Sequence, residues 1–254
     1  MAIEGLAWKI IKPTFELSDL IESFWMLENN SDLGHEMAIL PDGRVDVHFT
    51  IPANEGFTTP TLMGIQSKVG INVFPPREKV FAVSLTLLGL EMFLNQKYPD
   101  LLDNVFELPT GFWGISADDL SDFDHFVTKV STFLLNAKPE EIDSRKQKLF
   151  ELVYASRAAT VAEISQAASW SSRQINRYFQ AHFGISLKAY CGILRFSTSL
   201  SQVKLGKLFP ELNYADQAHF IREVKKYAEA TPSELRKNDH DRFIHIHLSS
   251  IPPE

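Results

Sequence analysis

Two helix-start signals lie eleven residues apart in the C-terminal third of the sequence, and this spacing limits the local fold more than any other feature. Thr160 is followed three positions later by Glu163, the spacing of a capping box. Ser171 and Gln174 repeat that spacing. The interval leaves room for only one short helix and a tight turn. The sequence therefore predicts a helix-turn-helix whose second helix ends at Gly184, a residue type favoured just past a helix end.

The second of these helices is predicted to be amphipathic. Ile175, Phe179 and Phe183 recur every four residues and share one face. The other face carries the polar side chains Ser172, Arg173, Asn176, Arg177 and Gln180. Polar donors on a helix that is held by a buried stripe are typical of a major-groove reader. The alternative is an ordinary solvent-exposed helix face.

A later stretch carries the most specific motif of the chain. Residues 214–224 read Tyr-Ala-Asp-Gln-Ala-His-Phe-Ile-Arg-Glu-Val, and residues 231–236 read Thr-Pro-Ser-Glu-Leu-Arg. Together with the first helix-turn-helix, they resemble the DNA-binding domain of the arabinose-operon regulator (AraC/XylS) family of bacterial transcription factors. The second recognition helix of that family carries Asp-Gln-x-His-Phe-x-Arg, followed by Pro-Ser-x-x-Arg.

The resemblance implies an all-α domain with two helix-turn-helix units joined by a long helix, here from Ile185 to about Leu205. A rigid connector of this kind sets the spacing of two recognition helices on DNA. The resemblance places Gln217 near bases, and His219 and Arg222 at the phosphate backbone. It also implies that Arg177 contacts phosphate or holds the domain together rather than reading bases.

The second unit departs from the family pattern at three places. Asn213-Tyr214 stands where the family has Gly-Phe, and Glu229 stands where it has a Gly at the helix end. The connection before this unit is also short and contains Pro210, so we expect its first helix to be one turn or absent. We therefore expect the second unit to read bases less than the first. Alanine at Gln217 should weaken operator binding less than alanine at Asn176.

The net charge of −7 divides unevenly along the chain. Residues 1–144 contain 22 acidic and 9 basic residues, a net charge of −13. Residues 145–242 contain 16 basic and 9 acidic residues, a net charge of +7, and Glu254 supplies the remaining −1. This asymmetry is expected when one domain meets DNA phosphates and the other does not. The alternative is an uneven division by chance.

The first 110 residues are predicted to be mostly β. After the turn Leu40–Arg44, the residues from Val45 to Thr50 alternate between apolar and polar, the period of a half-buried strand. The residues from Phe81 to Leu87 are apolar or small on both faces, which predicts a central strand, and Gly89–Gln96 reads as a helix that follows it.

This half also resembles the N-terminal domain of many regulators of the same family. The resemblance rests on Pro41-Asp42-Gly43, on Met63-Gly64-Ile65-Gln66 and on the segment from Val83 to Gly89. Leu88 stands where that domain often has a proline. No function is generally assigned to this domain type, so the resemblance implies a sensor-like role and no particular ligand.

The predicted fold class is α+β. Residues 1–139 form an N-terminal β-rich, barrel-like domain closed by an amphipathic helix over Asp118–Asn136. A further helix over Glu140–Ser156 leads into the DNA-binding domain, residues 140–238. Residues 239–254 form a tail in which alternation around His245 and His247 predicts a short strand.

The sequence gives no sign of a metal, cofactor or catalytic site. His35 and His48 are isolated, and the only His-x-His pair lies in the tail. Nucleophile-elbow, P-loop and dinucleotide-binding motifs are absent, which disfavours an enzyme. The single Cys191, expected to be a buried small residue, allows no internal disulfide. The N-terminus has no signal-peptide pattern and no stretch has the length of a membrane span, so we expect a cytoplasmic protein.

These observations predict a sequence-specific transcriptional regulator whose partner is double-stranded DNA. Its N-terminal domain is expected to sense a small-molecule effector or to mediate homodimerisation. Two alternatives remain at this point. In one, the DNA-binding domain has decayed and the protein is a protein-interaction module. In the other, the N-terminal domain is a barrel enzyme, or binds a small molecule or a metal, with the helices as an appendage.

Overall fold

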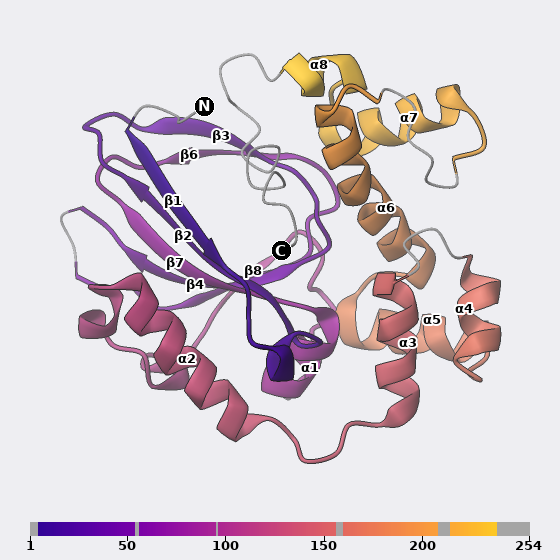
Figure 1. Ribbon diagram of the computed structural model, residues 1–254, viewed down its shortest axis with the longest axis horizontal. Helices are drawn as coiled ribbons and strands as arrows, with labels where there is room; N and C mark the ends of the chain where they lie inside the picture. The colour runs from indigo at the N-terminus through magenta and orange to yellow at the C-terminus, as the bar shows by residue number, and fades with distance from the viewer. Residues whose placement is uncertain (1–4, 54–55, 95, 156–159, 208–213, 238–254) are drawn as a thin grey trace.

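The computed structural model describes residues 5–53, 56–94, 96–155, 160–207 and 214–237, and all statements below concern these residues (Figure 1). An N-terminal β-rich part is followed by a C-terminal part made of helices, as the sequence predicts. The N-terminal part contains a six-stranded antiparallel sheet in the order β1-β2-β7-β4-β5-β8 and a separate two-stranded sheet of β3 and β6. The strands are β1 (Leu6–Ile11), β2 (Ile21–Asn29), β3 (His35–Ile39), β4 (Val45–Ile51), β5 (Thr61–Met63), β6 (Gly70–Phe74), β7 (Lys79–Leu85) and β8 (Val105–Glu107).

The expectation of a barrel-like domain is wrong in one respect, because the large sheet is open. Among the described residues, β1 pairs only with β2, and β8 pairs only with β5. The apolar face of the sheet is covered by a helix instead of by closure of the sheet on itself. Phe49 of β4 and Phe81 of β7 meet Phe126 of that helix with ring centroids 5.4 and 5.3 Å apart.

The covering helix is α2 (Phe123–Ala137), which starts later than predicted. Ser116 and Asp119 form a capping box that starts a separate 3₁₀ turn at Ala117–Leu120. Asp122 then begins α2 by accepting a hydrogen bond from the backbone N–H of His125 at 2.7 Å. Two successive cap residues therefore divide the predicted Asp118–Asn136 helix into a turn and a helix.

The helix after the central strand β7 is α1 (Leu87–Leu94), two residues ahead of the predicted start at Gly89. Thr86 acts as its cap, since its hydroxyl accepts from the backbone N–H of Gly89 at 3.0 Å. A Cβ atom on Gly89 would lie 1.9 Å from the carbonyl oxygen of Leu20, so only glycine fits there.

The C-terminal part contains six described helices. Both predicted capping boxes are present, at Thr160 with Glu163 and at Ser171 with Gln174. The helix predicted over Glu140–Ser156 starts only at Ser144, because the Asp143 carboxylate accepts from the backbone N–H of Arg145 at its start. The helices are α3 (Ser144–Ala155), α4 (Val161–Ala167), α5 (Ser172–Phe183), α6 (Leu187–Lys204), α7 (Gln217–Ala228) and α8 (Pro232–Lys237).

Most buried apolar residues of the sheet, of α1 and α2, and of the C-terminal helices belong to one continuous cluster. A smaller second cluster lies around Met37, Phe74 and Val80. The division of the chain at residue 139 stays a prediction. The expected first helix of the second unit, with Pro210 and Asn213, and the strand expected in the tail lie outside the described residues.

Candidate nucleic-acid interface

Helix α5 presents the polar face that the sequence predicts. Ile175, Phe179 and Phe183 are buried against the domain. Arg173, Arg177 and Gln180 are exposed or half-buried on the opposite face, as is Ser172. Gly184 ends the helix in the left-handed conformation, with φ of 66°.

Asn176 has a different position from its predicted neighbours. It is half-buried, and its Oδ1 accepts from the backbone N–H of Leu187 at 3.3 Å. Its Nδ2 donates to the backbone carbonyl of Ser172 at 3.0 Å. Both ends of the amide therefore connect α5 to the first turn of α6. This placement makes Asn176 a structural residue, and it weakens the expectation that Asn176 reads bases.

Helix α7 has the cap and core that a second recognition helix needs. Asp216 accepts from the backbone N–H of His219 at 2.6 Å, and Phe220 and Val224 are fully buried, as predicted. The helix ends at Glu229, which takes the left-handed conformation itself, with φ of 52°. The missing glycine therefore does not change the way this helix ends, although a non-glycine residue is strained there.

The predicted side chains of α7 are partly held by their own helix. Gln217 and Arg222 are exposed, and Arg222 Nε donates to the carbonyl of Ala218 at 3.2 Å. His219 lies closer to the domain, and its Nδ1 accepts from the backbone N–H of Ala215 at 3.2 Å. Since Nδ1 is the acceptor, Nε2 carries the proton and remains a donor. His219 can therefore donate to a phosphate without losing its contact with the domain.

The cations of the two predicted recognition helices form few ion pairs with the described residues. In the described part of the chain, no ion pair involves Arg173, Arg177 or Arg222. Lys226 of α7 lies 3.9 Å from Glu223 of the same helix, and His182 of α5 lies 3.8 Å from Glu91. Connecting helix α6 is largely buried and packs on the second unit through Phe196, whose ring lies 5.1 Å from that of Tyr227.

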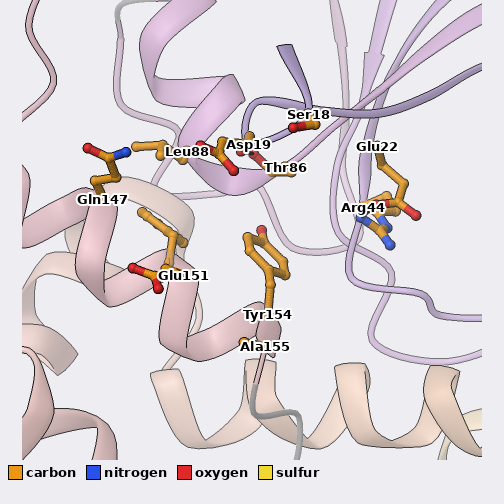
Figure 2. Close-up of a pocket in the computed structure, with 11 residues that line it drawn as sticks. Ser18, Asp19, Glu22, Arg44, Thr86, Leu88, Gln147, Glu151, Tyr154 and Ala155 are labelled. Atoms are coloured by element: carbon orange, nitrogen blue, oxygen red, sulfur yellow. Dashed lines mark hydrogen bonds and ion pairs between the residues drawn. The ribbon is translucent and has the colours of Figure 1, made fainter. Parts of the chain in front are cut away.

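A cavity of about 460 Å³ lies between the N-terminal part and α3 (Figure 2). The sequence does not predict it, because its walls come from segments far apart in the chain. Arg44 donates to Glu22 at 2.8 Å in its wall. Burial raises the pKa of Glu22, but Arg44 and Lys12 outweigh burial and hold that pKa below its usual value. The lining residues are Ser18, Asp19, Glu22, Arg44, Thr86, Leu88, Gln147, Phe150, Glu151, Tyr154 and Ala155.

The Tyr154 hydroxyl lies at this cavity and takes part in a hydrogen-bond relay between the two parts of the protein. It accepts from the backbone N–H of Leu87 at 2.9 Å, and it lies 2.9 Å from the Tyr190 hydroxyl of α6. Tyr190 donates to the carbonyl of Gly43 at 2.9 Å, so Tyr154 is the donor to Tyr190. The turn at Pro41-Asp42-Gly43 therefore contacts the connecting helix directly.

The isolated histidine and cysteine residues are not part of a metal-binding group in the described part of the chain. No group of three His, Cys, Asp or Glu side chains there has the geometry to hold a metal ion. His48 Nε2 is buried without a hydrogen-bond partner, and burial lowers the pKa of His48 to about 4. Cys191 is half-buried, and burial raises the pKa of its thiol to about 11. None of the described helices is long and apolar enough to span a membrane.

Comparison with known families matches both parts of the chain. Residues 164–238 match a family described as a helix-turn-helix domain, and residues 9–107 match a family described as a domain of unknown function. No curated protein matches the chain.

Among solved structures, the chain is similar to ToxT from Vibrio cholerae. An apo variant from strain SCE256 is 10% identical, with 92% of this chain and 97% of that one covered and a TM-score of 0.43. Wild-type ToxT from the same strain, bound to an unsaturated fatty acid, is 14% identical, with 82% and 95% covered and a TM-score of 0.42. A 1.65 Å structure of ToxT is 13% identical, with 92% and 98% covered and a TM-score of 0.42.

Proposed function

We propose that this chain is a DNA-binding transcriptional regulator of the AraC/XylS type and that it reads the major groove of DNA mainly with α5. The observation that carries this proposal is the polar face of a helix whose other face is buried. Arg173, Arg177 and Gln180 all lie on the polar face. In such docking, residues at the start of the helix and residues further along the same face reach base edges.

The individual side chains have different proposed roles. Arg173, in the first turn of α5, and Gln180 contact base edges, where arginine and glutamine make bidentate hydrogen bonds. Ser172 and Arg177 contact phosphates. On α7, Gln217 lies near bases, while His219 and Arg222 contact phosphates. The phosphate contacts supply most of the affinity and make it salt-dependent.

The test begins with selection of a preferred duplex from random sequences by the full-length protein. Arg173→Ala should weaken binding to the selected duplex about 10- to 100-fold and relax its base preference at one position. Lys148→Ala, which removes an exposed cation of α3, is the matched control and should leave binding within about twofold. Equal binding by wild type and Arg173→Ala, or no preferred duplex at all, would reject α5 as the reader.

The function of the N-terminal domain is proposed to be the sensing of a small molecule in the cavity between this domain and α3. The support is its position, because a molecule bound there contacts side chains of both parts, including Leu88 and Tyr154. A metabolite screen should identify a compound that raises the melting temperature of the wild-type protein. Leu88→Trp, which fills the cavity, should abolish that rise. If Leu88→Trp retains the response, the effector binds elsewhere.

Homodimerisation is the other route to control, and sedimentation at several protein concentrations distinguishes it from ligand sensing. We propose no catalytic reaction for the chain. Its place of action is the cytoplasm of a bacterial cell, where a regulator of this type meets DNA.

The capped and packed α7, with Gln217 and Arg222 exposed, supports a working second unit over a decayed one.

A further inference from the structure

We propose that the N-terminal domain sets the relative position of the two recognition helices by capping the C-terminal end of each. This inference rests on the proposed function, because it concerns how α5 and α7 meet DNA together. It assigns positioning roles to Glu91 and to the segments around Tyr98 and Val69, none of which contacts DNA. The resemblance to the family implies only that the connecting helix sets this spacing.

The same contact occurs at equivalent places in the two recognition helices. The backbone N–H of Tyr98 donates to the carbonyl of His182 at 3.0 Å, and the backbone N–H of Val69 donates to the carbonyl of Tyr227 at 2.7 Å. His182 and Tyr227 are each the second-to-last residue of their helix. Carbonyls in the last turn of a helix have no partner within the helix, so the N-terminal domain supplies one to each.

Side chains strengthen the contact at α5. The Glu91 carboxylate, on α1, accepts from the hydroxyl of Tyr178 on α5 and from the ammonium of Lys146 on α3. His182 Nδ1 lies 3.8 Å from the same carboxylate. The Glu91 side chain is only 12% exposed. A carboxylate that is this buried and holds two donors from different helices fixes both of them to α1.

The end of α5 and the N-terminal domain also pack closely through their backbones. A Cβ atom on Gly184 would lie 2.1 Å from the carbonyl oxygen of Pro99. The N-terminal domain therefore approaches the end of α5 at backbone distance. At α7, Lys68 and Glu229 add an exposed ion pair of 3.9 Å, which contributes little.

The connecting helix is itself held by the same domain. Figure 1 shows α6 running between α5 and α7, and Tyr190 of α6 donates to the carbonyl of Gly43 at 2.9 Å. All three helices that determine the spacing of the reading units therefore contact the N-terminal domain. Their attachments leave the start of α5, at Ser172 and Arg173, exposed or half-buried. The docked arrangement is thus compatible with DNA binding and restricts where the two helices lie.

The test measures spacing preference rather than affinity alone. A duplex selected by the full-length protein is rebuilt with one or two base pairs inserted or deleted between its two half-sites, and a single half-site serves as reference. Wild type should lose about tenfold in affinity when the spacing changes, because the two units then cannot bind simultaneously. Tyr178→Phe, which keeps the ring and removes the hydroxyl, and Val69→Pro, which removes the N–H donor, should each flatten this preference. Their affinity for the single half-site should stay within about twofold of wild type.

Two control variants make the outcome specific. Lys9→Ala breaks an exposed ion pair with Asp124 in the N-terminal domain and should keep the wild-type spacing preference. Glu91→Gln, which keeps the side-chain shape, should flatten the preference as Tyr178→Phe does, even if Val69→Pro fails to fold. Retention of the wild-type spacing preference by Tyr178→Phe and Glu91→Gln would overturn the inference. Failure of wild type to bind the half-site would instead reject the proposed function.

Discussion

The hydroxyl groups of Tyr154 and Tyr190 lie 2.9 Å apart and connect α3 to α6 across the junction with the N-terminal domain. Each hydroxyl also bonds to a backbone group of that domain, Tyr154 to the N–H of Leu87 and Tyr190 to the carbonyl of Gly43. Burial raises the pKa of both phenols, so both remain neutral donors at physiological pH.

Removal of one hydroxyl from this relay should therefore cost stability. Tyr190→Phe leaves the carbonyl of Gly43 without its donor, and we expect the free energy of unfolding to fall by about 1–3 kcal/mol. Urea denaturation measures it. Ser201→Ala, on the exposed side of the same helix, should change the free energy by less than about 0.5 kcal/mol. A Tyr190→Phe value as small as that of Ser201→Ala would show that the relay does not stabilise the fold.

Asn176→Ala should lower the stability of the protein, and any loss of DNA affinity should follow from that loss of stability. The substitution removes the acceptor for the Leu187 N–H at the start of α6, and we expect a loss of about 1 kcal/mol. Gln180→Ala, an exposed position on the same helix, should leave stability unchanged. Thermal melts compared with affinities for the selected duplex separate the two effects. A loss of affinity for Asn176→Ala without any loss of stability would restore it as a base reader.

Two titrating groups on one face of β4 should give opposite pH dependences. Burial, and then repulsion by Asp42, raise the pKa of Asp46 to about 7, while burial lowers the pKa of His48 to about 4. Between about pH 4 and 7, Asp46 is therefore protonated in the folded protein and ionised in the unfolded chain. Its contribution to the free energy of unfolding is lost as pH rises through this range. The contribution of His48 is present above its unfolded pKa and is lost as pH falls from about 6.5 to 4.

Single substitutions separate these contributions. In His48→Gln, the slope of the free energy of unfolding against pH should be more negative than in wild type between about pH 4 and 6.5, because the positive contribution of His48 is removed. In Asp46→Asn, that slope should be more positive than in wild type between about pH 4 and 7, by at most about 1.4 kcal/mol per pH unit. Urea denaturation at a series of pH values measures both slopes, with Asp100→Asn, at an exposed position, as the control. Changes of slope of the same sign in the two variants, each measured against wild type, would contradict this assignment.

Gly184→Ala should lower the free energy of unfolding by more than the strain of its positive φ angle alone. The φ angle of 66° costs an alanine about 1–2 kcal/mol, and the new Cβ would also collide with the carbonyl of Pro99. Gly111→Ala is a matched control, since Gly111 has φ of 74° and an added Cβ there would meet no atom within 4 Å. The difference in the free energy of unfolding isolates the collision. Equal losses would mean that the end of α5 moves away from the N-terminal domain without cost.

Local features of the C-terminal part could be predicted from the sequence, because each depends on neighbouring residues. The capping pairs at Thr160 and Ser171 fix helix starts, and the four-residue spacing from Ile175 to Phe183 fixes the buried face of α5. Glu229 shows the limit of such rules. The family's glycine is missing, yet the helix ends in the same left-handed conformation.

Features that depend on distant contacts could not be predicted. Alternation along Val45–Thr50 shows that a strand has one apolar face, but not whether the sheet closes or is covered by a helix. Asn176 has the residue type and spacing of a base reader, and only its contact with Leu187, eleven residues later, shows its structural role. Glu91 carries no sequence signal, because its partners Lys146 and Tyr178 lie 55 and 87 positions away.

The continuous core shared by the two parts has a consequence for protein engineering. A chimera that grafts the C-terminal helices onto a foreign N-terminal domain would expose Tyr190 and Leu194, which are buried against Gly43 of the original domain. Such a fusion should aggregate unless the recipient presents a matching apolar surface. Exchange of the N-terminal domain therefore also requires transfer of the residues at its contact surface with the C-terminal helices.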